Sequence, residues 1–148
     1  MDFAERLHET EEFLYAKIPL TRAMQVRVES YDENGLVLTA PLAANHNHLG
    51  TAFGGSLAAL VMLAGYASLW LELGDRAAHI VISESNLRFR RPVRGTLRAV
   101  CGRPDDSALA EFKSNFAAKG KAWIQLKVEI EADDELAVIF DGTYVAKK

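Results

Sequence analysis

Cysteine is almost absent from this chain. The 148 residues include one, Cys101, which excludes a disulfide framework and a multi-cysteine metal site. The N-terminal segment, residues 1–15, also lacks the apolar run of a secretory signal, because acidic residues are scattered through it. These two absences predict a protein of a reducing compartment, and we expect it to be cytoplasmic.

An excess of positive charge is lacking as well. The 17 Lys and Arg residues are outnumbered by 20 Asp and Glu residues, which gives a net charge of −3 and an isoelectric point near 5.8. A nucleic-acid-binding surface needs the opposite balance, so nucleic acid is not an expected partner. The length suits one domain with a full core, and we expect a single domain over residues 1–148.

Charge is missing altogether from one long stretch. No Lys, Arg, Asp or Glu lies between His48 and Glu72, a length sufficient to cross a bilayer. Glycine and serine residues interrupt the stretch and strand-like segments flank it, so a buried central helix at residues 54–73 is favoured over a membrane span. Its apolar residues cover most of the helix circumference, which requires burial on nearly every side.

The rest of the chain reads as short alternating elements. Asn34-Gly35 predicts a hairpin turn, and a change of apolar parity between Ile82 and Leu87 predicts a β-bulge. Ser107 is a candidate N-cap for a short helix. The predicted elements are a helix at 2–16, strands at 23–31 and 36–42, the central helix, strands at 79–93 and 96–103, a helix at 108–118, and strands at 121–132 and 135–145.

This order predicts an α+β domain in which an antiparallel sheet curls around the central helix. One sheet leaves part of an all-apolar helix uncovered. A second copy of the chain would cover the remainder, so we expect a homodimer or a higher assembly.

A polar loop leads into the helix through Gly54 and Gly55. Backbone N–H groups at a helix start bind anions, and glycine lets a ligand approach them closely. Close packing of helix against sheet is the structural alternative. His46 and His48 in the same loop are candidates for donating a proton or binding a metal, but their spacing, with no Cys or acid beside them, is a weak metal pattern. Exposed loop histidines are favoured, and we expect no metal and no cofactor.

Three stretches carry a family resemblance: NHNHLGTAFGGSL at 45–57, SNLRFRRPV at 85–93 and FDGTYV at 140–145. They resemble the stand-alone hotdog-fold malonyl-[acyl-carrier-protein] decarboxylases, long labelled as thioesterases, whose domain also occurs fused behind an acetyltransferase-like domain. The resemblance covers nearly the whole chain. It implies a hotdog fold and decarboxylation of malonyl-acyl carrier protein to the acetyl form, which supplies a starter for fatty-acid synthesis.

The resemblance also implies site residues. A loop Asn is catalytic in that family and matches Asn45, with Asn47 as the near rival. An enolate forms when CO2 leaves a malonyl thioester, and the N–H groups at Gly54 and Gly55 are expected to hold its oxygen. Asn45 would then bond the malonyl carboxylate or the thioester carbonyl, whereas capping of the loop is its structural alternative.

Many hotdog thioesterases carry His-Gly-Gly at the helix start and an acid about two turns into the helix. Here Phe53 stands at the His position, and the helix has no acid before Glu72. The pattern therefore favours chemistry that needs no general base. The alternative is an acyl-CoA or acyl-carrier-protein thioesterase in which Glu84 or a loop His activates water. A non-catalytic module that binds acyl thioesters is a third possibility.

Further candidates follow in one strand. Glu84 is either a substrate-binding group or the partner of an Arg, and Ser85 either bonds a ligand or fills the strand. Four cations then gather in seven residues, and they suit an acidic carrier protein or the phosphate of its prosthetic arm or of CoA. A solvated strand edge that resists aggregation is the alternative. The four are Arg88, Arg90, Arg91 and Arg94.

Overall fold

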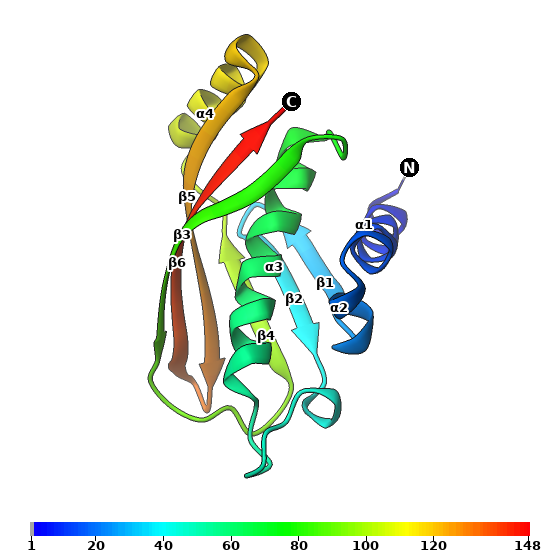
Figure 1. The fold of residues 1–148 in the computed structure, drawn as a ribbon, viewed down its shortest axis with the longest axis vertical. Helices are drawn as coiled ribbons and strands as arrows, with labels where there is room; N and C mark the ends of the chain where they lie inside the picture. Colours follow the sequence, from blue (N-terminus) through cyan, green and yellow to red (C-terminus); the bar gives the residue numbers. More distant parts are fainter. Residues whose placement is uncertain (1) are drawn as a thin grey trace.

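A single long helix, α3 (Gly54–Leu73), lies against one face of a curved sheet (Figure 1). The structure is a computed structural model and describes residues 2–148. All neighbouring strands are antiparallel, and their order is β1-β2-β4-β5-β6-β3. The expected α+β fold, with an antiparallel sheet around a central helix, is confirmed. The strands are β1 (Arg27–Asp32), β2 (Gly35–Ala40), β3 (His79–Phe89), β4 (Leu97–Gly102), β5 (Lys121–Ala132) and β6 (Glu135–Lys147).

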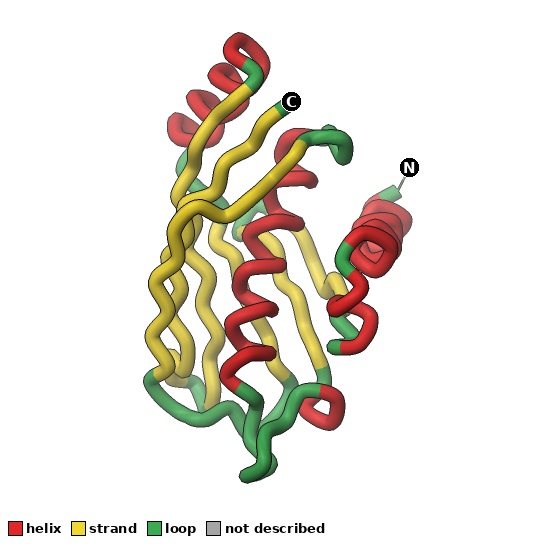
Figure 2. Tube along the Cα trace, in the orientation of Figure 1, coloured by secondary structure: helices red, strands yellow, loops and turns green. Residues whose placement is uncertain are grey.

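The other α-helices of the described chain lie outside the layer that α3 and the sheet form (Figure 2). They are α1 (Phe3–Lys17), α2 (Pro19–Ala23) and α4 (Asp106–Lys119). The α1 helix lies beside β1, and its Glu11 accepts hydrogen bonds from the backbone N–H of Val28 at 3.1 Å and from Arg27 at 2.9 Å. One edge of the sheet is therefore tied to a helix, whereas β3 at the other edge has β6 as its one neighbour among the described residues.

Alternating apolar side chains build the core. In β5 the even-numbered residues from Ala122 to Ile130 are buried, whereas most of the odd-numbered residues are exposed. Tyr144 of β6 is fully buried on the same side and donates a hydrogen bond to the carbonyl of Met62 in α3 at 2.8 Å. A Cβ on Gly65 would stand 2.1 Å from the Tyr144 hydroxyl, so helix and sheet approach this closely because Gly65 has no side chain.

The α3 helix is the described helix that is long and apolar enough to cross a membrane. Here it packs against the sheet, and 56% of its most apolar 18-residue stretch is buried. A stripe at helical spacing remains only half-buried, and it is named the α3 stripe below. Its members are Ala59, Met62, Tyr66 and Trp70.

Two of the local predictions in the sheet are confirmed. The β1–β2 hairpin turns at Glu33-Asn34 and pairs Asp32 with Gly35, whose φ of 122° suits glycine. The β3 strand carries its irregularity between Ile82 and Glu84.

Several predicted boundaries were wrong. Pro19 ends α1 but also begins α2, and the first strand starts at Arg27 instead of residue 23 because Gln25 takes a left-handed φ of 58°. The third strand ends at Phe89, before the predicted residue 93. Ser107 is not an N-cap: Asp105 caps α4 and accepts a hydrogen bond from Ala108 N–H at 2.8 Å.

Candidate functional site

The loop before α3 is anchored by Asn45. This residue is 2% exposed, and its amide nitrogen donates to the carbonyls of Met24 at 2.9 Å and Pro41 at 2.8 Å. Its backbone carbonyl accepts from Phe53 N–H at 2.7 Å. Asn45 therefore joins the end of α2, the end of β2 and the residue that precedes α3.

These bonds decide what Asn45 can still do chemically. Both acceptors are carbonyls, so the nitrogen of the amide must face them and the assignment of the two side-chain atoms is unambiguous. Asn45 Oδ1 is buried and has no hydrogen-bond partner among residues 2–148. The expected bond from the Asn45 amide to a substrate carboxylate or carbonyl is unavailable in this conformation. The free group is an acceptor, and leaving it unpaired costs roughly 1–3 kcal/mol.

Asn47 shapes the tip of the same loop. Its Oδ1 accepts from the N–H groups of Leu49 at 2.8 Å and Thr51 at 3.2 Å, and its nitrogen donates to the Thr51 hydroxyl at 2.9 Å. These bonds close a tight turn with Leu49 at its tip. His46 and His48 are both exposed beside it, which matches the favoured sequence interpretation.

The start of α3 presents unpaired donors. Phe53 is the N-cap residue and provides no side-chain cap, and the first intrahelical bond runs from Leu57 N–H to the Phe53 carbonyl at 3.0 Å. The N–H groups of Gly54, Gly55 and Ser56 thus have no partner within the helix, and the helix dipole adds to their attraction for negative charge.

Gly54 and Gly55 differ in their surroundings. A Cβ on Gly54 would meet no atom within 4 Å, so open space lies beside its backbone. A Cβ on Gly55 would stand 2.3 Å from the ring of Phe53. The Phe53 ring therefore lies on Gly55 while Phe53 remains 55% exposed, and a side chain at position 55 would displace the ring.

The arginine-rich segment runs beside the loop, because Val93 accepts a hydrogen bond from Ala52 N–H at 2.8 Å. Arg91 forms an ion pair with Glu135. Arg88, Arg90 and Arg94 are exposed and form no ion pair within residues 2–148. Arg90 and Arg94 lie within three residues of that contact, whereas Arg88 pairs with Ile139 on the outer side of the sheet.

Glu84 and Ser85 point to opposite faces of the sheet. Ser85 pairs with Gly142 on the side that faces α3, whereas Glu84 pairs with Thr143 on the outer side. There Glu84 borders a hollow of about 650 Å³ with Gln125 and Lys127. Within one chain the structure does not bring Glu84 to the helix start.

The acid of α3, Glu72, lies at the opposite end of the helix. Its carboxylate accepts from Tyr31 at 2.5 Å, Arg103 at 3.1 Å and Lys113 at 3.1 Å. Burial acts to raise the pKa of Glu72, but the hydrogen bonds from Tyr31, Lys113 and Arg103 outweigh it and hold that pKa below its ordinary value. Glu72 therefore has a structural role and stabilises the fold.

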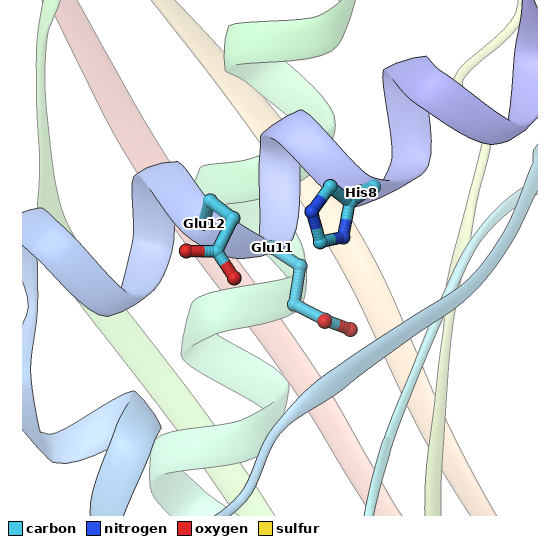
Figure 3. Close-up of side chains that lie close together, drawn as sticks. All are labelled: His8, Glu11 and Glu12. Atoms are coloured by element: carbon cyan, nitrogen blue, oxygen red, sulfur yellow. The ribbon is translucent and has the colours of Figure 1, made fainter.

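One group of side chains has the spacing of metal ligands. His8, Glu11 and Glu12 lie on α1 with their ligand atoms within 4.8 Å of one another (Figure 3). The Glu11 carboxylate is already paired with Arg27. In this structure Glu11 attaches α1 to β1, and the group lies on α1, apart from the loop that leads into α3.

The sheet wrapped around α3 is the fold of hotdog thioesterases. Residues 7–148 match the family described as "Putative thioesterase (yiiD_Cterm)", and the chain belongs to that family.

Solved structures agree with this assignment. A protein of unknown function from Chlorobaculum tepidum is 34% identical with a TM-score of 0.92, and the match covers 99% of this chain and 96% of that one. A protein from Shewanella oneidensis with the same thioesterase description is 29% identical, with a TM-score of 0.84 and coverage of 98% and 99%. One of unknown function from Pseudomonas aeruginosa is 27% identical, with a TM-score of 0.79 and coverage of 95% and 94%.

Proposed function

We propose that this protein decarboxylates malonyl thioesters carried on acyl carrier protein to the acetyl form, at the start of α3, in support of the initiation of fatty-acid synthesis. The observation that carries the proposal is the helix start itself. It combines unpaired N–H donors and open space at Gly54 with the absence of a carboxylate in the first turns of α3.

The chemistry needs little beyond these donors. The bond between the malonyl carboxylate carbon and the methylene carbon breaks, CO2 leaves, and the electron pair moves into the thioester to form an enolate. The N–H groups at Gly54 and Gly55 would stabilise the enolate oxygen, which carries more charge than the original carbonyl. A proton from solvent on the methylene carbon then completes the acetyl group.

Phe53 and the apolar helix favour this reaction over hydrolysis. Hydrolysis requires a base that activates water, and a malonyl carboxylate needs poor solvation before it departs. The Phe53 ring on Gly55 provides an apolar wall at the helix start. Ser85, on the α3 side of β3, is an additional candidate for substrate contact.

The role proposed for Asn45 follows from its hydrogen bonds. By holding Phe53 N–H it sets the geometry of the helix start, and its buried Oδ1 is an acceptor for a substrate donor. Asn47 contributes by closing the loop tip. We assign Asn45 two roles, in place of that of a donor to the malonyl carboxylate: it positions the helix start, and its Oδ1 accepts a hydrogen bond from the substrate.

The proposed binding surface for the carrier is formed by Arg88, Arg90 and Arg94. Acyl carrier protein is acidic and its prosthetic arm carries a phosphate, as CoA does, so exposed unpaired cations at this surface would attract either. The protein is proposed to act as a homodimer, because β3 has a free edge and the α3 stripe is only half-covered within one chain.

Thioester hydrolysis is the second candidate, and the family description favours it. One assay separates the two. The protein is incubated with malonyl-acyl carrier protein and the intact carrier is weighed by mass spectrometry. We expect the acetyl thioester to accumulate. Free carrier thiol would identify a thioesterase. An unchanged malonyl carrier would indicate a non-catalytic module that binds acyl thioesters.

A further inference from the structure

An aromatic groove opens at the end of α3 that is farther from the candidate site. It has a volume of about 500 Å³ and is bordered by the end of α1, the last turns of α3 and the first residues of β3. Trp70 forms its floor, with the ring of Phe13 at 4.9 Å and that of Tyr66 at 5.7 Å between centroids. Ala77 and His79 are exposed on its rim. Lys17 and Arg76 also border the groove, and the Arg76 guanidinium lies 5.6 Å from the centroid of the Phe13 ring. The groove is therefore an aromatic surface with a basic margin, and within residues 2–148 it remains partly open.

The loop at the other end of α3 carries a matching apolar group. Leu49 is 73% exposed, more than any other large apolar side chain within residues 2–148. The hydrogen bonds from Asn47 hold the turn around it, so Leu49 is presented on a fixed tip. A rigid apolar projection loses little conformational entropy when it docks.

The direction of β3 relates the two features. This strand begins at His79, which borders the groove, and ends at Phe89, four residues before Val93, which accepts from Ala52 N–H. Figure 1 shows β3 running from the C-terminal end of α3 toward its N-terminal end. If the free edge of β3 pairs antiparallel with the same edge of a second copy, the twofold axis stands perpendicular to the sheet. Both α3 helices then lie on the same face and run in opposite directions. The loop of each copy comes to the groove end of the other.

We propose that Leu49 of each copy docks into the Phe13–Tyr66–Trp70 groove of a second copy. The proposal rests on the homodimer included in the proposed function. The α3 stripe runs from the helix start to the groove, so one continuous contact would cover both. It follows that the loop entering each α3 is held in part by the other protomer.

Cysteine cross-linking tests this contact in the full-length protein. In the Leu49→Cys/Ala77→Cys double variant, mild oxidation should give covalent dimers on a non-reducing gel. The native Cys101 is fully buried and does not compete. Matched controls are each single variant and Leu49→Cys/Gln125→Cys, in which the second thiol lies on the outer face of the sheet. Cross-linking of the first pair at least tenfold faster than the controls supports the proposal, and equal rates overturn it.

A second measurement keeps the proposal independent of thiol geometry. Leu49→Asp should raise the dimer dissociation constant, measured by light scattering over a concentration series, at least tenfold above that of Leu20→Asp. Leu20 is a matched control because it is 54% exposed and lies on α2. An unchanged constant for Leu49→Asp, or a monomeric wild-type protein, overturns the docking. Neither readout uses turnover, so a cross-linked dimer without decarboxylase activity would defeat the proposed function and leave this contact intact.

Discussion

The two ends of α3 are built in opposite ways. At its C-terminal end, the Glu72 carboxylate has three donors and Gly74 closes the helix by donating its N–H to the Trp70 carbonyl. At its N-terminal end, three backbone donors have no intrahelical partner, and Asn45 Oδ1 has no hydrogen-bond partner in the described part of the chain. A stable fold normally satisfies buried polar groups, so the buried, unpaired Asn45 Oδ1 indicates a place for a ligand. The N–H groups at the helix start are only partly buried, and they are open to a ligand or to water. The comparison places stability at the C-terminal end of the helix, and the proposed function uses the N-terminal end.

The largest effect on turnover is expected at Gly54. Gly54→Val fills the open space beside the helix-start N–H groups, and we expect kcat/KM for decarboxylation to fall roughly 100-fold, the size of losing one oxyanion donor. Thermal unfolding should change little, because the new Cβ meets no atom within 4 Å. Gly102→Val is the matched control, since it has equal space on β4 and should keep full activity. Full activity in Gly54→Val would place the chemistry elsewhere.

Asn45 should affect both stability and turnover. Asn45→Ala leaves the carbonyls of Met24 and Pro41 without their donor, which should lower the free energy of unfolding by roughly 2–4 kcal/mol. Asn45→Asp should destabilise more, because an acceptor would then face two carbonyl oxygens. Urea unfolding measures both. Under folding conditions we also expect at least a tenfold lower kcat, and a variant with wild-type kcat would remove Asn45 from the site.

A substitution of Glu72 tests the C-terminal end of α3, which is assigned to stability. Glu72→Gln should lower the free energy of unfolding at pH 7 by roughly 2 kcal/mol, because charge-assisted hydrogen bonds are lost, and it should leave turnover unchanged. The folded-state pKa of Glu72 is depressed, so its contribution is present above the ordinary value of 4.5 and disappears as the pH falls below it. Unfolding curves of the wild type and the variant should therefore converge in acid. A separation that persists in acid, or a loss of kcat, would contradict this division of the helix.

The smallest effect is expected at the arginine segment. Arg94→Gln should raise KM for the acyl carrier protein about threefold with kcat unchanged, and the difference should shrink as salt is added. Arg98→Gln is the control, because Arg98 is paired with Glu29 and lies on β4. Equal KM values for the two variants would remove the segment from carrier binding.

The sequence predicted α3, the first hairpin and the bulge in β3 because each depends on local signals: an unbroken apolar run, Asn-Gly, and a parity change. It did not predict α2, since Pro19 is compatible with both the end and the start of a helix. The sequence left the face of Glu84 open, because the parity change places the bulge only between Ile82 and Leu87, and the exact position of a bulge decides which residues after it face the core.

The helix start was predicted from its glycines, and capping of the loop was named as the structural alternative for Asn45, but its hydrogen-bond partners were not predicted. Its acceptor Met24 lies 21 positions away, and no local pattern reports a contact across such a distance. The exposure of Leu49 at the loop tip likewise depends on how Asn47 folds the turn.

The central claim is that the helix start stabilises an enolate, and it is tested most directly by running the reaction in deuterated water. Malonyl-acyl carrier protein is incubated with the wild-type protein and with Gly54→Val, and the intact carrier is weighed. We predict that the wild type gives an acetyl thioester with deuterium incorporated at the methyl carbon, while Gly54→Val leaves the malonyl form largely intact. Free carrier thiol from the wild-type protein, without an acetyl intermediate, would contradict the claim.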